Sequence, residues 1–204
     1  MKERHSMTVE ASATENPPLV RVGLTGLLCG LSFRCVVADP PWTPSLHRNT
    51  VGRREPKNGY RAGPQKYYQT LTLPEICELQ PVTANKCHLW LWVLSQHVDW
   101  GYAVARAWGF EPQQMLTWAK PTLGTGQFQC NTEHVLLCRK GGPVDNAFGV
   151  TGGTWFEWPR REHSEKPSEF FSLVERVSPG PRLEMFARTR RQGWESWGDQ
   201  IEAA

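Results

Sequence analysis

The stretch "FRCVVADPPW", residues 33–42, decides the fold class of this chain of 204 residues. Its first six residues are mostly apolar, and they lack the alternation of polar and apolar positions that a half-exposed strand shows. Such a run is typical of a strand buried on both faces, as in a sheet that helices cover from each side. We therefore predict an α/β fold with this strand inside the sheet.

Strand and helix patterns alternate along the rest of the chain. Further strands are expected at residues 87–94, 113–121, 133–141 and 182–187. Helices are expected at residues 72–79, with Thr72 as N-cap, at 98–110, and at 167–177, with Pro167 in the first helical position. This alternation is typical of βαβ units and predicts a largely parallel sheet. Residues 141–158 are expected to hold a short strand or a lid, and residues 189–204 a loop.

The composition favours a single soluble domain. Since 39% of the residues are hydrophobic, the chain can bury a sizeable core; we assign residues 1–18 to a flexible tail and residues 19–204 to one domain. No apolar run approaches the roughly 18 residues of a membrane span. Six cysteines without metal-ligand spacing, and no signal-peptide pattern, predict reduced thiols, no metal site and a cytoplasmic location.

The polar end of the opening stretch is a candidate site for a planar amine. In open α/β sheets, ligands bind outside the carboxyl ends of strands, where Asp39 emerges. The two prolines restrict the backbone, so Asp39 and Pro40 present a carboxylate and a carbonyl as acceptors beside the ring of Trp42. An exocyclic amine of a nucleobase donates two hydrogen bonds, and Trp42 is a candidate to stack on that base. The alternative is a strand-ending turn in which Asp39 caps its own backbone.

Residues 43–67 form a long segment without periodicity, rich in basic residues and holding the single acid Glu55. The net charge of the chain is only +3, so the case for a nucleic-acid partner depends on this local cluster. Long loops inside compact domains are usually functional or disordered. We predict that this segment contacts a phosphate backbone, and a solvated loop is the alternative. Its basic residues are Arg48, Arg53, Arg54, Lys57, Arg61 and Lys66.

Several motifs, taken in their order along the chain, resemble one enzyme family. "ADPPW" at 38–42 is followed by "LWLWV" at 89–93, "WAKP" at 118–121, "EHVLLCRKG" at 133–141, "HSEKP" at 163–167 and "RLEMFAR" at 182–188. Together they resemble the DPPW adenine N6 amino-methyltransferases related to the catalytic subunit of the eukaryotic mRNA N6-adenosine methyltransferase. The chain is similar to the compact bacterial and phage members, which implies the cytoplasm of a bacterium or of a phage-infected cell. The resemblance runs from about Cys35 to Gln200.

The resemblance implies methyl transfer from S-adenosylmethionine to N6 of adenine, in a Rossmann-like fold of permuted motif order. The implied catalytic motif is Asp39, Pro40, Pro41 and Trp42, with Tyr68 also packing around the base. The implied cofactor residues are Asp39, Lys166, Phe186, Arg188, Arg191, Asp199 and Gln200. No glycine-rich phosphate loop follows "RLEMF", so the prediction of this cofactor depends on the resemblance.

Two strand ends near this site carry further candidates. Glu133 and His134 begin a strand, and both are candidates for placing the substrate; a strand-cap role is the alternative. Lys120 ends another strand near the same rim, where a solvated lysine is the alternative. His163 is expected to be a helix-entry residue.

The predicted partner of the enzyme is nucleic acid, with DNA preferred because the chain is short and resembles compact members. RNA is the alternative within this class. A catalytically silent nucleic-acid-binding partner subunit is the alternative from another class, since a fold of this kind also serves as a platform. Methylation of a small molecule or of a protein amide is a further alternative.

Overall fold

The computed structural model describes residues 30–43, 70–122, 130–143, 152–159, 165–199 and 201. These residues build one seven-stranded sheet in the order β5-β3-β4-β2-β1-β6-β7. The strands are β1 (Phe33–Ala38), β2 (Thr83–Val93), β3 (Glu111–Ala119), β4 (Thr132–Lys140), β5 (Trp155–Glu157), β6 (Arg182–Met185) and β7 (Glu195–Trp197). Among these strands, β4 alone runs antiparallel to both neighbours, so the predicted, largely parallel Rossmann-like sheet is confirmed.

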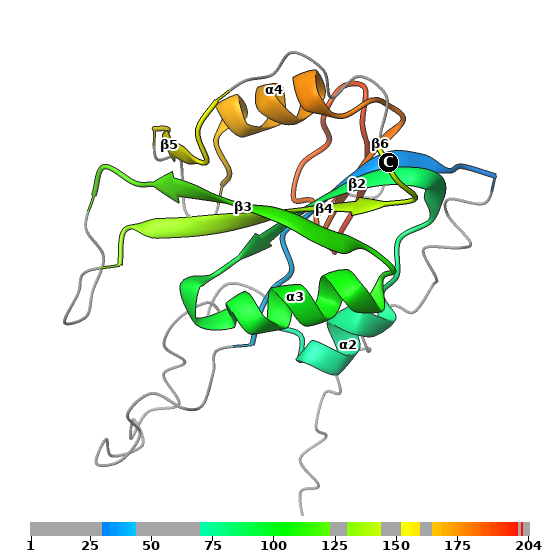
Figure 1. Cartoon of the computed structure of the whole chain (residues 1–204), viewed down its shortest axis with the longest axis horizontal. Helices are drawn as coiled ribbons and strands as arrows, with labels where there is room; N and C mark the ends of the chain where they lie inside the picture. Colours follow the sequence, from blue (N-terminus) through cyan, green and yellow to red (C-terminus); the bar gives the residue numbers. More distant parts are fainter. Residues whose placement is uncertain are drawn as a thin grey trace, which may run out of the picture.

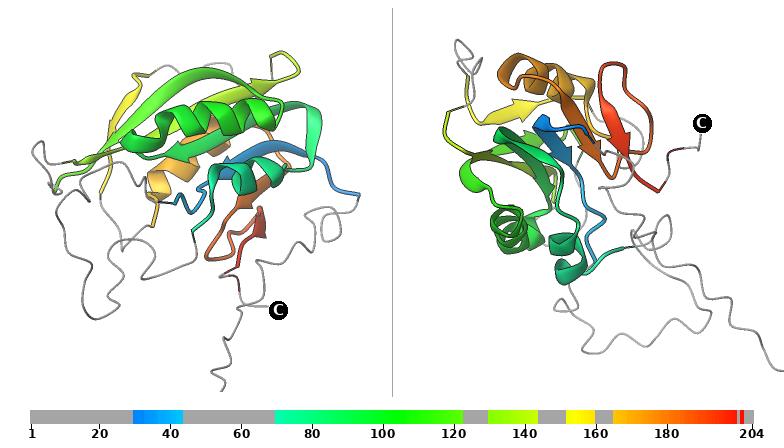
Figure 2. Two further views of the ribbon diagram at one scale, coloured as in Figure 1. Left: turned by 90° about the horizontal axis from the view of Figure 1, so that it is seen from below. Right: turned by 90° about the vertical axis from the view of Figure 1, so that its right-hand side faces the viewer.

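Helices cover both faces of this sheet. Helices α2 (Leu73–Glu78) and α3 (Val98–Ala107) lie against one face, and α4 (Ser168–Val177) lies against the other (Figure 1). The right-hand view of Figure 2 shows the sheet between α3 and α4. A short 3-10 turn, η2 (Ser95–His97), links β2 to α3. None of the helices among the described residues is long and apolar enough to cross a membrane.

Strand β1 is buried on both faces, as its sequence predicts. Val36 and Ala38 belong to the core beneath α2 and α3, whereas Cys35 and Val37 belong to the core beneath α4. The strand pairs in parallel with β2 on one side and with β6 on the other. An apolar run without alternation is what a strand in this position requires, because neither of its faces meets water.

Strand β1 is also where the order of the sheet reverses. From β1 the chain passes through α2 to β2 on one side, and it later returns through α4 to β6 on the other side. Ligands of open α/β sheets bind at such a switch point, outside the carboxyl ends of the strands. Asp39 follows β1 and Phe186 follows β6, and the strands end in register, with Ala38 paired to Met185. These two residues therefore leave the sheet side by side.

The helix ends follow the expected chemistry with one shift. Thr72 is the N-cap of α2, as predicted, and its backbone N–H donates to Glu75 Oε2 at 2.7 Å in a capping box. Pro167 is the N-cap residue of α4, one position earlier than the first helical position predicted for it. Its carbonyl accepts a hydrogen bond from the Phe170 N–H at 3.1 Å.

Two predictions at the end of the chain differ from the structure. Strand β6 ends at Met185 and not at Ala187, because Phe186 turns away with a φ of 60°. The segment expected to be only a loop contains β7, which pairs with β6 from Leu183 opposite Glu195 to Met185 opposite Trp197. Three residues are too few to show a period, so the pairing comes from the neighbouring edge of the sheet. The short strand expected within residues 141–158 is β5.

Candidate active site

The corner after β1 is held by backbone hydrogen bonds. The Trp42 N–H donates to the Pro40 carbonyl at 2.8 Å, and the Leu71 N–H donates to the Pro41 carbonyl at 2.8 Å. The Thr43 N–H in turn donates to the Leu71 carbonyl at 3.0 Å. Because a carbonyl oxygen has two lone pairs, that of Pro40 keeps room for a second donor. The predicted rigid corner is thus tied to the segment that leads into α2.

Trp42 lies inside the fold, with 4% of its surface exposed. Its Nε1–H donates to the Trp92 carbonyl at 3.1 Å, and its ring stacks on His97 with centroids 5.9 Å apart and planes at 12°. From the sequence, Trp42 is a candidate to stack on a base. The structure instead packs this indole in the core, where it supports the corner from below.

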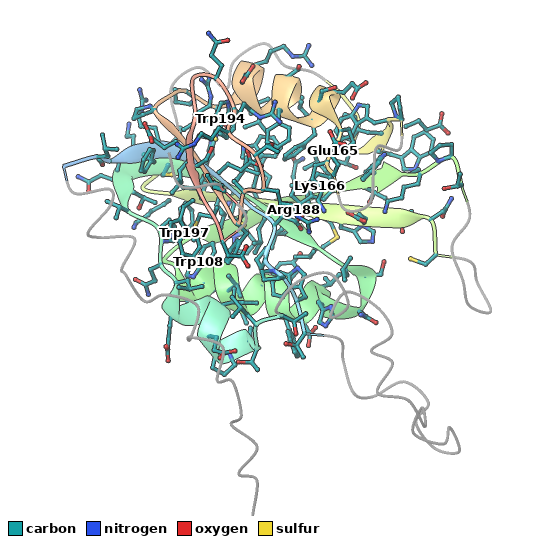
Figure 3. The ribbon with its side chains drawn as sticks, turned by 180° about the vertical axis from the view of Figure 1, so that it is seen from behind. Trp108, Glu165, Lys166, Arg188, Trp194 and Trp197 are labelled. Carbon is teal, nitrogen blue, oxygen red and sulfur yellow. The ribbon has the colours of Figure 1, made fainter. Side chains whose placement is uncertain are left out.

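A chain of four charged groups begins at Asp39. Lys166 Nζ lies 2.7 Å from Asp39 Oδ2 and 3.2 Å from Glu133 Oε2. Lys120, at the end of β3, forms a further ion pair with Glu133 on β4. Lys166 Nζ also lies 4.8 Å from the centre of the Trp92 ring. Figure 3 shows Lys166 beneath the orange helix α4, with Arg188 on the same side of the molecule.

These contacts keep the partly buried network charged. Burial acts to raise the pKa of Glu133, but Lys166 and Lys120 outweigh it and lower that pKa to about 2. Burial acts to lower the pKa of Lys166, and the carboxylates of Asp39 and Glu133 outweigh it and raise that pKa. Glu133 is therefore a counterion between two lysines, and Lys120 is not the solvated lysine of the alternative interpretation.

His134, the neighbour of Glu133, is fixed by two polar contacts. Its Nδ1 lies 3.1 Å from Thr117 Oγ1, and its Nε2 lies 3.1 Å from Ser95 Oγ. Burial lowers the pKa of His134, against the opposing effect of Glu133. The ring therefore joins β3, β4 and η2 at the carboxyl edge of the sheet.

The turn after β6 forms the other side of the site. Phe186 adopts a left-handed φ of 60°, which is rare for a bulky residue and is typical of functional sites. Its ring meets that of Trp197 edge to face, with centroids 5.4 Å apart. The Ala187 N–H donates to the Trp197 carbonyl at 2.9 Å, and a Cβ added at Gly198 would lie 2.1 Å from the Ala187 oxygen. Only glycine permits this close approach of the two chain segments.

Glu184 is a candidate site residue that the sequence analysis missed. Burial raises the pKa of its carboxyl to about 7; Arg191 opposes this shift, and Asp39 adds to it. Arg191 Nε lies 3.9 Å from Glu184 Oε2, and the guanidinium lies 3.5 Å from the centre of the Phe171 ring. Arg191, predicted to contact the cofactor, thus also contacts Glu184 and Phe171 of the protein. The signal in the sequence is an acid between two buried apolar residues, Leu183 and Met185, of a short strand.

Part of the predicted site falls outside the described residues. The two ends of the basic segment, Thr43 and Leu71, are described and are hydrogen-bonded to each other at the corner. Asp199 is described and exposed. Within the described ranges, no group of three or more His, Cys, Asp or Glu is placed to hold a metal ion. The predicted residues outside these ranges are Arg48, Arg53, Arg54, Lys57, Arg61, Lys66, Tyr68, His163 and Gln200.

Comparison with known proteins then assigns the family, because the MT-A70 family model matches residues 33–200. The chain belongs to the MT-A70 family. In this MT-A70 chain, the match begins at the first residue of β1 and includes every described strand. The predicted family and the predicted Rossmann-like fold are both confirmed.

Relatives of this MT-A70 chain include bacterial and eukaryotic methyltransferases. The type II methyltransferase M.MunI of Mycoplasma sp is 25% identical over 183 residues, which cover 83% of this chain and 78% of that protein. The human N(6)-adenosine-methyltransferase catalytic subunit METTL3 is 28% identical over 183 residues, or 83% of this chain and 28% of that protein. An MT-A70-like N(6)-adenosine-methyltransferase of Arabidopsis thaliana is 29% identical over 182 residues, or 83% of this chain and 24% of that protein.

The chain thus spans only about a quarter of the length of these human and plant relatives. The predicted enzyme class, an adenine N6-methyltransferase, is confirmed by the family and by the names of these relatives. Methyltransferases of this family in general take their methyl group from S-adenosylmethionine.

Proposed function

We propose that this chain transfers a methyl group from S-adenosylmethionine to N6 of adenine in DNA, with Asp39 and the Pro40 carbonyl as the acceptors of the amine. The observation that carries this proposal is the corner after β1. It presents a carboxylate and a braced carbonyl at the switch point of the sheet, beside the end of β6. We also propose that residues 19–204 form the methyltransferase domain.

The chemistry of the substrate explains why two acceptors are needed. The N6 lone pair of adenine is delocalised into the ring, so the amine is a poor nucleophile. Two acceptors on its hydrogens favour a more tetrahedral nitrogen and stabilise the positive charge that develops there. Asp39 accepts one hydrogen and the Pro40 carbonyl the other. Asp39 need not be a strong base, because the proton can leave after the methyl group has been transferred.

Lys166 and Glu133 position Asp39 in this proposal. A carboxylate offers about four lone-pair sites, so Asp39 can hold Lys166 through Oδ2 and still accept a hydrogen bond from the amine. Glu133 Oε2 lies 3.2 Å from Lys166 Nζ. Glu133 therefore gives this lysine a second carboxylate partner while Asp39 binds the substrate amine. Trp42 acts by holding the corner and not by stacking on the base.

The residues around the ends of β1 and β6 suit the proposed cofactor. S-adenosylmethionine carries a cationic sulfonium and ammonium, a carboxylate and an adenine ring; when bound, it supplies an electrophilic methyl group. Asp39 and Glu184 match the cationic groups, and the Phe186 and Trp197 rings match the adenine. Ser196 Oγ on β7 is buried and has no hydrogen-bond partner among the described residues, as expected for a group that meets a ligand. Lys166, Arg188, Arg191, Asp199 and Gln200 complete the proposed cofactor site by resemblance.

The preference for DNA is supported by the share of each relative's length that this chain covers. The chain covers 78% of M.MunI, a type II methyltransferase, but only 28% of METTL3, which is named for adenosine, a ribonucleoside. A target base inside a duplex must be flipped out at a cost of a few kcal/mol, or be presented in a single strand. We propose that the basic segment between Thr43 and Leu71 holds the phosphate backbone, because its ends meet at the corner. RNA is the second candidate substrate.

Incubation of the purified chain with labelled S-adenosylmethionine and separate pools of DNA, RNA and protein tests the proposal. We expect label in DNA, recovered as N6-methyladenine after digestion. Label in RNA alone supports the second candidate, and label only in protein overturns the proposal. Asp39→Asn keeps the shape of the side chain and is expected to abolish transfer while the protein still folds. Calorimetry distinguishes the silent partner, which would not bind the cofactor.

A further inference from the structure

His97 lies directly behind the corner, although nothing in its sequence context marks it as functional. It ends η2, just after the carboxyl end of β2, and its side chain is completely buried. The ring is stacked on Trp42 on one side and tilted against Trp100, with centroids 4.7 Å apart, on the other. Its Nε2 lies 2.9 Å from the carbonyl oxygen of Thr43. His97 therefore contacts both residues that follow the two prolines.

The partner of Nε2 determines the tautomer of the ring. A carbonyl oxygen only accepts hydrogen bonds, so Nε2 must carry the proton and donate it to Thr43. Nδ1 is then an acceptor; it is buried and finds no hydrogen-bond partner among the described residues. Burial lowers the pKa of His97 more than the Thr43 hydrogen bond and Asp99 raise it, so the ring is neutral.

A purely apolar residue would pack here without leaving a buried acceptor unsatisfied. Phenylalanine has a ring of similar size for the stack with Trp42 and carries no nitrogen. The polar ring adds one thing, a donor for the Thr43 carbonyl. That carbonyl belongs to the residue whose N–H binds Leu71, and Leu71 in turn binds the Pro41 carbonyl. The donor thus secures the far end of a closed set of backbone hydrogen bonds.

We propose that His97 is a positioning residue of the methyl-transfer site, which holds the Trp42 and Thr43 end of the corner so that the Pro40 carbonyl keeps its direction. This inference rests on the proposed function, because the direction of that carbonyl matters only if it accepts a substrate amine. Small displacements of groups around a reacting centre reduce the rate of reaction with little effect on ground-state binding.

Two variants of His97 separate the donor from the stacked ring. His97→Phe keeps the ring and removes the donor, whereas His97→Gln places an amide N–H close to the position of Nε2. We expect the single-turnover rate of methyl transfer to fall on the order of 10- to 100-fold in His97→Phe, with the Kd for S-adenosylmethionine unchanged within about twofold. His97→Gln is expected to recover most of this loss. Recovery by a donor on a non-aromatic side chain is not what a mere packing role predicts.

His88 provides the matched control. It is a second buried histidine, which lies on β2, and it hydrogen-bonds to Ser178 away from the corner. His88→Gln is expected to leave the rate of methyl transfer unchanged. A His88→Gln protein that is as slow as His97→Phe overturns the positioning role, because the loss would then follow from any change in a buried histidine.

Nitrogen-15 NMR of the histidine side chains adds a measurement that is independent of turnover. We expect the His97 ring to be neutral at pH 8, with its proton on Nε2. A proton on Nδ1 overturns the inference. An inactive wild-type protein overturns the proposed function, whereas an active wild type with an equally active His97→Phe variant overturns only the role of His97.

Discussion

The ammonium group of Lys166 lies 2.7 Å from Oδ2 of Asp39, so the two residues form an ion pair across the candidate site. They are far apart in the sequence: Asp39 follows β1, and Lys166 precedes α4. Glu133 holds the same lysine from the other side. Asp39, the residue proposed to bind the substrate amine, is therefore oriented by Lys166. This lysine has a second carboxylate partner in Glu133.

Replacing Lys166 with methionine should remove this orientation. Asp39 and Glu133 would then face each other without a cation between them, so we expect a loss of stability on the order of 2 to 4 kcal/mol. We also expect methyl transfer to fall at least about 10-fold. Denaturant unfolding and single-turnover assays measure the two effects. Lys86→Met is the control, because Lys86 is exposed; equal losses in both variants would contradict the prediction.

Glu133 should make stability depend on pH in the acid range. Lysine neighbours lower its pKa to about 2 in the folded chain, from an ordinary value of 4.5. A lowered carboxyl pKa contributes stability that is present above pH 4.5 and is lost as the pH falls towards 2. Urea unfolding of the wild type and of Glu133→Gln between pH 2.5 and 6 should therefore show a flatter profile in the variant. Parallel profiles of stability against pH in the two proteins would contradict the lowered pKa of Glu133.

His88 should make stability depend on pH at higher pH values than Glu133 does. Burial, and then Arg139, lower the pKa of His88 to about 4, so the folded protein holds this ring neutral. The unfolded chain takes up a proton near pH 6.5, and stability is thus lost as the pH falls from 6.5 towards 4. Between pH 7 and pH 5, the free energy of unfolding measured by thermal unfolding should fall by about 2 kcal/mol less in His88→Gln than in the wild type. An equal drop in both proteins is the contrary result.

Gly198→Ala should disturb the turn that joins β6 and β7. The new Cβ would lie 2.1 Å from the backbone oxygen of Ala187, which cannot yield as a flexible side chain would. We expect destabilisation by about 1 to 3 kcal/mol and weaker binding of S-adenosylmethionine. Gly152→Ala is the control, because nothing lies within 4 Å of a Cβ at that position. Unchanged stability and affinity in Gly198→Ala would argue against the close contact.

The sequence predicted the elements that carry a clear local pattern of residues. Strand β1 shows an apolar run, and α2 begins with the threonine, proline and glutamate of a helix start. Strand β7 was missed because its three residues carry no period, and it forms only where β6 offers an open edge. Glu184 was missed because a polar residue that alternates with apolar ones is ordinary in a short strand, and only the folded structure shows that burial raises the pKa of its carboxyl to about 7.

The rigid corner follows from local sequence, since prolines restrict their own φ angle and the residue before them wherever they occur. The order of motifs that marks the family follows from the sequence as well. The surroundings of the corner depend instead on the folded chain: the pairing of Asp39 with Lys166, the second carboxylate of Glu133, and the His97 ring behind Trp42. These contacts join strand ends that lie far apart in the chain. They depend on sheet register and side-chain packing, which no local pattern of residues encodes.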